Sequence, residues 1–257
     1  MKPSITWAKD KLKIIFSVIF WVGVWQIAAF LMKKEVLLAS PRATFAALTS
    51  LCGQWAFWRI LAFSVGRILA GFFTGLICGV VLAALSAKYE IVRVILSPFF
   101  AVVKSVPVAS FVILALLWVR GSNLSVVISF LMVMPIVYSN MCRGFEAVDK
   151  KLLEMAGVFR LGAWKTFLYI YLPRLMPFFT SACTSSLGLC WKSGVAAEVI
   201  GLPRGSIGNR LYETKLYLNT PAMFAWTAVI IVISFAAEKL FIWRLDKVCD
   251  KIRKGFL

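Results

Sequence analysis

The sequence contains no histidine and few acidic residues: 11 Asp and Glu stand against 29 Lys and Arg in 257 residues. Its six cysteines include no Cys-x-x-Cys pair, so the usual ligands of a zinc site are missing. The motif G-x-x-x-x-G-K-[ST] is also missing, which excludes an ATPase motor of the phosphate-loop class. General acid–base and metal-assisted chemistry lack their usual residues. We therefore predict no catalytic residue, cofactor or metal, and an enzyme is the weakest functional interpretation.

Apolar residues, by contrast, are abundant. They make up 61% of the chain, and the mean hydropathy of +0.87 is far above that of an ordinary soluble domain. The net charge of +18 could indicate a nucleic-acid partner, but the basic residues cluster between apolar runs instead of covering one surface. We predict an all-α, polytopic membrane protein in contact with lipid and without nucleic acid.

Six stretches come close to the roughly 20 helical residues that cross a bilayer. We predict one transmembrane domain over residues 1–257, with six transmembrane helices at 14–32, 60–85, 94–119, 124–141, 175–200 and 222–240. The first is expected to stay attached, because no cleavage pattern of a signal peptide follows it. Lys and Arg are concentrated on alternate connections, which places both chain ends and the loop 147–173 in the cytoplasm.

Glycines at a spacing of four, Gly71, Gly75 and Gly79, mark one face of the second predicted helix. Small residues at this spacing let helix backbones approach closely in a membrane. We therefore predict that this face packs tightly against another helix of the chain.

The third predicted helix, 94–119, is interrupted by Pro98 and Pro107. Proline frees backbone carbonyls, which is tolerated in a membrane where they are buried in protein or line a wet cavity. One interpretation is a pathway wall, with Pro107, Ser110 and Trp118 facing the cavity. The other is a kink that serves helix packing alone.

Two positive charges, Arg67 and Lys192, fall deep inside apolar helices, where a charge costs at least ~2.5 kcal/mol at mid-depth. The nearest acid to Lys192 is Glu198, but six residues turn a helix by about 240°, so the two do not share a face. Glu198 is therefore a possible partner of Arg67. All three are candidates for a translocation path, in which an uncompensated Lys192 favours a small anion. The alternatives are a structural clamp for Arg67 and a snorkelling side chain for Lys192.

The segment 151–173 is neither apolar enough to span a membrane nor polar enough for a simple linker. Ala156, Gly157 and Gly162 are small enough to let another backbone approach. Larger side chains recur among them at roughly helical spacing: Leu153, Phe159, Trp164 and Phe167. These residues fit either a helix gripped by a partner protein or a basic amphipathic loop on lipid headgroups.

Part of this segment resembles the "EAA" signature of ABC importer permeases, a cytoplasmic loop whose helix docks into the ATP-binding subunit. The matching positions are Glu154, Ala156, Ile170, Leu172 and Pro173. Met155 departs from the signature by replacing its second small residue. Arg160 departs from it by standing where the family usually has glycine. Since Gly157 and Gly162 flank the missing glycine, we expect the turn after the helix to be shifted.

The resemblance extends from about Leu37 to Lys239 and is to the nitrate/sulfonate/taurine branch of these permeases. It rests on Leu38–Pro41, Ser64–Arg67 with Ala70–Gly71, Val106–Trp118, Ala197–Gly201 and Phe224–Thr227. It implies a type I ABC importer permease fold in the cell inner membrane. The implied partners are an ABC ATP-binding subunit, a second permease copy and an external solute-binding protein.

The resemblance also implies which residues do the work. Those implied to contact the ATP-binding subunit are Glu154, Met155, Ala156, Gly157, Arg160 and Gly162. The implied solute is small and anionic, like a sulfonate or nitrate. The main alternative is an ion-coupled secondary transporter, which would need acidic groups inside the membrane. Glu198 alone lies near a membrane interior.

Overall fold

The computed structural model describes the backbone of residues 4–254, together with the side chains of residue 13, residues 15–245 and residue 247. All regular secondary structure in this part of the chain is helical, which confirms the predicted all-α class. The helices form two compact units. The chain ends at residues 1–3 and 255–257, predicted to be cytoplasmic, lie outside the described residues.

The first unit comprises residues up to 59 and residues 210–230. It contains α1 (Ser4–Met32), α2 (Pro41–Cys52) and parts of α3 (Trp55–Lys88), α10 (Ile207–Leu216) and α11 (Thr220–Lys254). Trp25 of α1 stacks on Phe224 of α11 at 5.6 Å between ring centroids, and its indole N–H donates to the Ala39 carbonyl at 3.0 Å. The Thr220 hydroxyl donates to the Val36 carbonyl at 2.6 Å. These contacts fix the loop after α1 against the start of α11.

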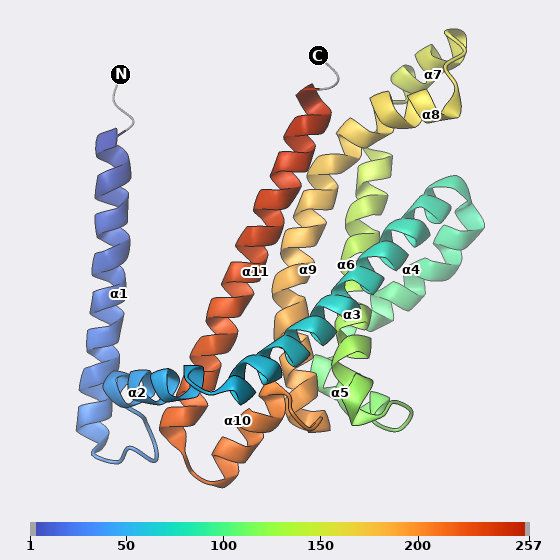
Figure 1. The fold of residues 1–257 in the computed structure, drawn as a ribbon. Helices are drawn as coiled ribbons and strands as arrows, with labels where there is room; N and C mark the ends of the chain where they lie inside the picture. The colour runs from blue at the N-terminus through green and yellow to red at the C-terminus, as the bar shows by residue number, and fades with distance from the viewer. Residues whose placement is uncertain (1–3, 255–257) are drawn as a thin grey trace. The chain divides into compact units, whose positions relative to one another are not determined.

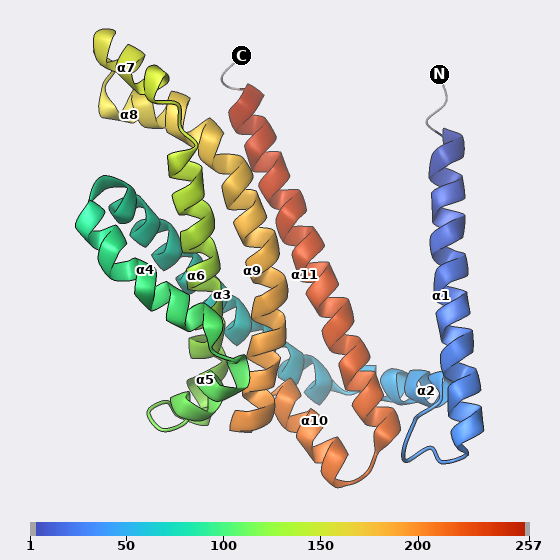
Figure 2. The same ribbon diagram turned by 180° about the vertical axis from the view of Figure 1, so that it is seen from behind.

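The second unit comprises residues 60–209 and the chain from 231 onward. Besides most of α3, it holds α4 (Glu90–Ser105), α5 (Val108–Ala115), α6 (Gly121–Glu146), α7 (Lys150–Val158), α8 (Ala163–Thr166), a π-helical turn (Phe167–Tyr171) and α9 (Leu172–Gly201). Helices α6 and α9 run side by side as its centre (Figure 1). Seen from behind, α7 and α8 lie at one end of this pair and α5 at the other (Figure 2).

The predicted glycine face of α3 lies directly against α6. A Cβ atom added at Gly75 would come within 2.9 Å of Val133 Cβ, and one at Gly79 within 2.8 Å of Val137 Cβ. A Cβ atom at Gly71 would meet the backbone of Val126 and Phe130 and the side chain of Ser129, also on α6. Because no side chain fits at these positions, the prediction of close helix packing is confirmed.

The predicted helix 94–119 is two helices in the structure. Helices α4 and α5 meet at an angle of 103° across a break at Val106 and Pro107. Proline lacks an N–H and pushes the preceding residue into extended conformation, as seen in the Val106 angles of φ −80° and ψ 132°. Pro98, in contrast, lies inside α4 without ending it.

Among the described residues, four helices are long and apolar enough to cross a membrane, or five if the bent α4–α5 pair is one span. The sixth predicted span, 175–200, falls in the 30-residue helix α9, which is long enough but too polar by composition. Its polar residues include Thr180, Ser181, Thr184, Ser185, Ser186 and Lys192. Helix α9 packs against α6 and α5, so much of its surface meets protein and does not need to be apolar.

Candidate functional site

The loop between α6 and α9 begins with helix α7. Asp149 caps it, because its side-chain oxygen accepts the Lys151 N–H at 2.9 Å. Ala156 lies on the inner face of α7 with only 3% of its surface exposed, in a cluster with Val148 and Ile170. Its small size therefore serves packing within the chain. A larger residue at position 156 would disturb this cluster before it could obstruct any partner.

The outer face of the loop carries large apolar side chains. Val158 is 80% exposed, Phe159 71% and Trp164 73%, and the ring of Trp164 stacks on Phe167 at 6.1 Å between centroids. Glu154, Met155, Gly157 and Gly162 are exposed as well, and no atom lies within 4 Å of where a Cβ would stand at either glycine. An exposed apolar patch of this kind marks an interaction surface.

The turn after α7 occurs at Arg160, which takes the left-handed conformation with φ +50°. The Leu161 N–H donates to the Ala156 carbonyl at 2.9 Å, and the Arg160 N–H donates to the Gly157 carbonyl at 3.0 Å. This pair of bonds is the Schellman motif that ends many helices, usually with glycine at the left-handed position. The expected shift of the turn is therefore wrong: the turn stays at Arg160, with arginine in a conformation that favours glycine.

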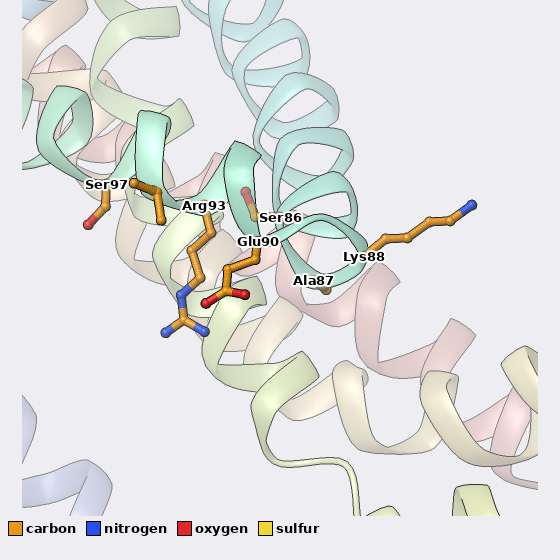
Figure 3. A pocket seen from close by; sticks show the side chains of 7 residues that line it. Ser86, Ala87, Lys88, Glu90, Arg93 and Ser97 are labelled. Atoms are coloured by element: carbon orange, nitrogen blue, oxygen red, sulfur yellow. The ribbon is translucent and has the colours of Figure 1, made fainter.

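An ion pair connects the start of this loop to α4. Arg93 Nη2 lies 2.6 Å from Glu146 Oε1, and Glu146 is the last residue of α6. Beside it, a cavity of about 620 Å³ is lined by Ser86, Ala87, Lys88, Glu90, Arg93, Val94 and Ser97. In Figure 3, Glu90 and Arg93 lie close together while Lys88 points away from them. The balanced charges favour a connection between helices over a site for a charged ligand.

The exposed face of α9 is a stripe of small and polar residues. Ser181, Ser185 and Lys192 are exposed, and no atom lies within 4 Å of where a Cβ would stand at Gly188 between them. Their spacings of four, three and four residues place all four on one face of a helix. Lipid would not favour such a face, so this α9 stripe fits a hydrated surface. Among the described residues, no ion pair or hydrogen bond engages the Lys192 ammonium.

The break between α4 and α5 presents the other predicted path residues. Pro107 and Ser110 are exposed, and Trp118, in the turn after α5, is 79% exposed. On the opposite side of α5, Val112 and Ala115 pack into a cluster with α6 and α9. One side of α5 is therefore buried packing, and the other, with Ser110, is an open surface.

Arg67 and Glu198 have different hydrogen-bond partners. Arg67 Nη2 donates to Asn123 Oδ1 at 3.0 Å, and the Arg67 guanidinium lies 4.7 Å from the centre of the Phe63 ring. Glu198 is fully buried, and its Oε2 accepts hydrogen bonds from Ser64 Oγ at 2.7 Å and from the Gly208 N–H at 3.2 Å. The Arg67 side chain bonds to an asparagine, not to the helix-end carbonyls or the acid considered from the sequence. In this structure Glu198 faces protein on all sides.

Sequence reasoning named Ser64 only as part of a family motif and missed its bond to Glu198, across 134 residues of chain. It also missed Ser181, Ser185 and Gly188 of the α9 stripe. The stripe could have been found, because small polar residues at helical spacing from Lys192 are visible in the sequence. No local signal marks the bond between Ser64 and Glu198, since the two residues are distant in the chain.

Comparison with known proteins shows the family of this chain. The family described as binding-protein-dependent transport system inner membrane component matches residues 75–242. The taurine transport system permease protein TauC of Escherichia coli (strain K12) is 24% identical over 220 residues, 83% of this chain and 80% of the relative. The putative aliphatic sulfonates transport permease protein SsuC of Bacillus subtilis (strain 168) is 24% identical over 238 residues, 91% of this chain and 85% of the relative.

The fold is shared with solved structures. Inward-facing conformations of the MetNI methionine ABC transporter match with a TM-score of 0.54 at 17% sequence identity. The match covers 76% of this chain and 93% of that chain. At this identity the likeness is one of fold, and it agrees with the fold predicted from the sequence.

Proposed function

Because the chain belongs to the family of binding-protein-dependent transport system inner membrane components, we propose that it is the permease subunit of an ATP-driven importer. The family component is a membrane protein without enzymatic activity of its own. ATP hydrolysis falls to a separate ATP-binding subunit, and an external binding protein delivers the solute. The chain lies in the inner membrane, with the α7 loop and both ends in the cytoplasm, as the distribution of Lys and Arg favours.

The α7 loop is the docking site for the ATP-binding subunit. Its apolar residues Met155, Val158, Phe159 and Trp164 leave about half or more of their surface exposed. Glu154 and Gly157 lie on α7 among them, Arg160 forms the turn that follows, and Gly162 precedes α8. The Arg93–Glu146 ion pair then connects a movement of this loop to α4 and so to the α4–α5 break.

The α9 stripe is the wall of the translocation path, and it is the observation that carries this part of the proposal. Its polar surface requires water or protein, and one chain with this exposed stripe does not enclose a passage. A second copy of the chain facing the first would bury both stripes in a shared path. Pro107, Ser110 and Trp118 contribute the exposed surface of the α4–α5 break to the same path.

The solute is a small anion. Lys192 places a positive charge on the stripe without an acidic partner among the described residues. A unit charge 4 Å away contributes about 1 kcal/mol in water and about 4 kcal/mol in a partly shielded site. The relatives named for taurine and for aliphatic sulfonates are consistent with an anionic group on the solute.

Uptake by the intact complex tests this assignment. Wild type, Lys192→Gln and Lys192→Glu are reconstituted with the ATP-binding subunit and the binding protein, and uptake of labelled taurine and ethanesulfonate is measured. Since about 1 kcal/mol corresponds to about a fivefold effect, Lys192→Gln should lower anion uptake at least that much and Lys192→Glu more. If all three forms carry the anion equally well, the charge of Lys192 has no part in selection.

A further inference from the structure

A buried group of side chains in the second unit joins α3, α9 and the start of α10. Ser64, Glu198, Ser206 and Ile207 each have 0% of their surface exposed. The Ile207 N–H donates to Ser64 Oγ at 2.9 Å, and Ser64 Oγ donates in turn to Glu198 Oε2 at 2.7 Å. The Gly208 N–H donates to the same Glu198 oxygen at 3.2 Å. We call Ser64, Glu198, Ile207 and Gly208 the α10 clasp.

The clasp completes the capping of α10. The first four N–H groups of a helix have no partner within the helix and need acceptors from elsewhere. Ser206 Oγ takes the N–H of Asn209 at 3.0 Å, which is the usual local cap. The N–H groups of Ile207 and Gly208 are instead taken by side chains from α3 and α9. The Ser206 N–H donates to the Pro203 carbonyl at 3.2 Å, so all four donors have acceptors, and two of those acceptors are side chains of other helices.

Close packing keeps the clasp closed. A Cβ atom at Gly208 would collide with the backbone and Cβ of Glu198, so the chain approaches α9 there as closely as it can. Only Oε2 of Glu198 accepts in the clasp, while Oε1 is buried without a hydrogen-bond partner among the described residues. Both hydrogen bonds to Glu198 therefore end on one oxygen, Oε2, and a side chain of glutamate length is needed to bring it there.

We propose that Glu198 is a positioning residue that holds the start of α10 on α3 and α9 by supplying a hydrogen-bond acceptor. By holding α10 there, it also fixes the turn 202–206 at the end of α9, where Leu202 is left-handed with φ +48°. Lys192 lies six residues before Glu198 in the same helix, so the clasp steadies the end of the α9 stripe. This last consequence rests on the proposed path, whereas the clasp itself does not.

The proposal separates the acceptor from the charge. Glutamine at position 198 has the same length and keeps an acceptor oxygen for Ser64 and Gly208. Aspartate keeps the charge but is one methylene too short to reach both. If Glu198 acts as a hydrogen-bond acceptor, Glu198→Gln should keep the clasp and transport better than Glu198→Asp does. If Glu198 instead carries charge, protons or solute, Glu198→Asp should be the better of the two.

Hydrogen–deuterium exchange of the full chain in nanodiscs tests this ranking at the amides of Ile207 and Gly208. A buried donor without its acceptor costs about 1–3 kcal/mol, so Ser64→Ala, Glu198→Ala and Glu198→Asp should exchange there roughly 5- to 100-fold faster. Glu198→Gln should stay within about threefold of wild type. Ser206→Ala is the matched control, since it removes one local cap bond and should speed exchange mainly at Asn209.

Uptake by the reconstituted complex gives the second measurement. Glu198→Gln should restore most of the transport lost in Glu198→Asp, with the loss in the maximal rate and not in the half-saturating solute concentration. Slow exchange in Glu198→Asp together with fast exchange in Glu198→Gln would overturn the proposal. If the exchange pattern holds but no anion is carried by any form, the proposed function fails and the clasp stands.

Discussion

The left-handed turn at Arg160 gives a prediction that can be worked from the backbone. Arg160 has φ +50°, a region in which a side chain costs roughly 1–2 kcal/mol and glycine costs nothing. Arg160→Gly should therefore stabilise the turn, while Arg160→Ala removes the same charge and keeps the strain. The two variants should therefore differ in the stability of the turn by the cost of the left-handed backbone alone, which is about 1 kcal/mol.

The assay is amide exchange of Leu161, whose N–H closes the turn by donating to the Ala156 carbonyl at 2.9 Å. A difference of about 1 kcal/mol corresponds to about fivefold, so Leu161 should exchange about fivefold more slowly in Arg160→Gly than in Arg160→Ala. A preformed turn should also bind the ATP-binding subunit up to about fivefold more tightly, because less ordering remains for binding.

The two Arg160 variants also distinguish strain from direct contact. If Arg160 itself binds the partner, both should lose affinity together, and the exchange difference should remain. Equal exchange of Leu161 in Arg160→Gly and Arg160→Ala would refute the reasoning, because the strain it assumes would then be absent. Exchange at the Lys151 amide, held by the Asp149 cap at the other end of α7, should be unchanged and serves as the internal reference.

Two further predictions concern the exposed surfaces. Gly157→Trp should reduce capture of the ATP-binding subunit at least tenfold without loss of membrane insertion, because no other atom of the chain lies within 4 Å of a Cβ at that position. Gly23→Trp is the control, since a Cβ there is equally free of contacts but lies outside the loop. Equal capture by both variants would remove α7 from the interface. Ser110→Cys in a background without native cysteines should react with a water-soluble maleimide at a rate that changes with ATP, while Val112→Cys, fully buried on the same helix, should not react. An unreactive Ser110→Cys in every state would make α5 a packing element.

Much of the fold was predictable because its causes are local. The glycine spacing on α3 and the proline at position 107 are each visible within a few residues of sequence, so the close packing of α3 and the break before α5 could be predicted. The six predicted spans are not all confirmed, because α9 is too polar by composition to qualify as a membrane span. Helix α9 meets protein over much of its surface and carries more polar residues than a lipid-facing helix tolerates.

In the α7 loop, too, some features were predictable from the sequence and others were not. A helix does form at the signature residues: α7, capped by Asp149. The turn after it was expected to be shifted, yet Arg160 adopts the left-handed conformation because the two Schellman bonds and the buried Ala156 hold the chain in that place. Ala156 fits the signature as a small residue, but only the packing of Val148 and Ile170 around it reveals that it faces inward.

By itself, the sequence determined the all-α class, the membrane location and the family, since hydropathy, charge bias and short motifs are properties of neighbouring residues. Only the tertiary structure decided the hydrogen-bond partners of Glu198 and Arg67. Ser64 and Glu198 are 134 residues apart, and Arg67 and Asn123 are 56 apart. Such pairs form because helices α3, α6 and α9 are packed together, and a buried polar group takes whichever partner that packing brings within reach.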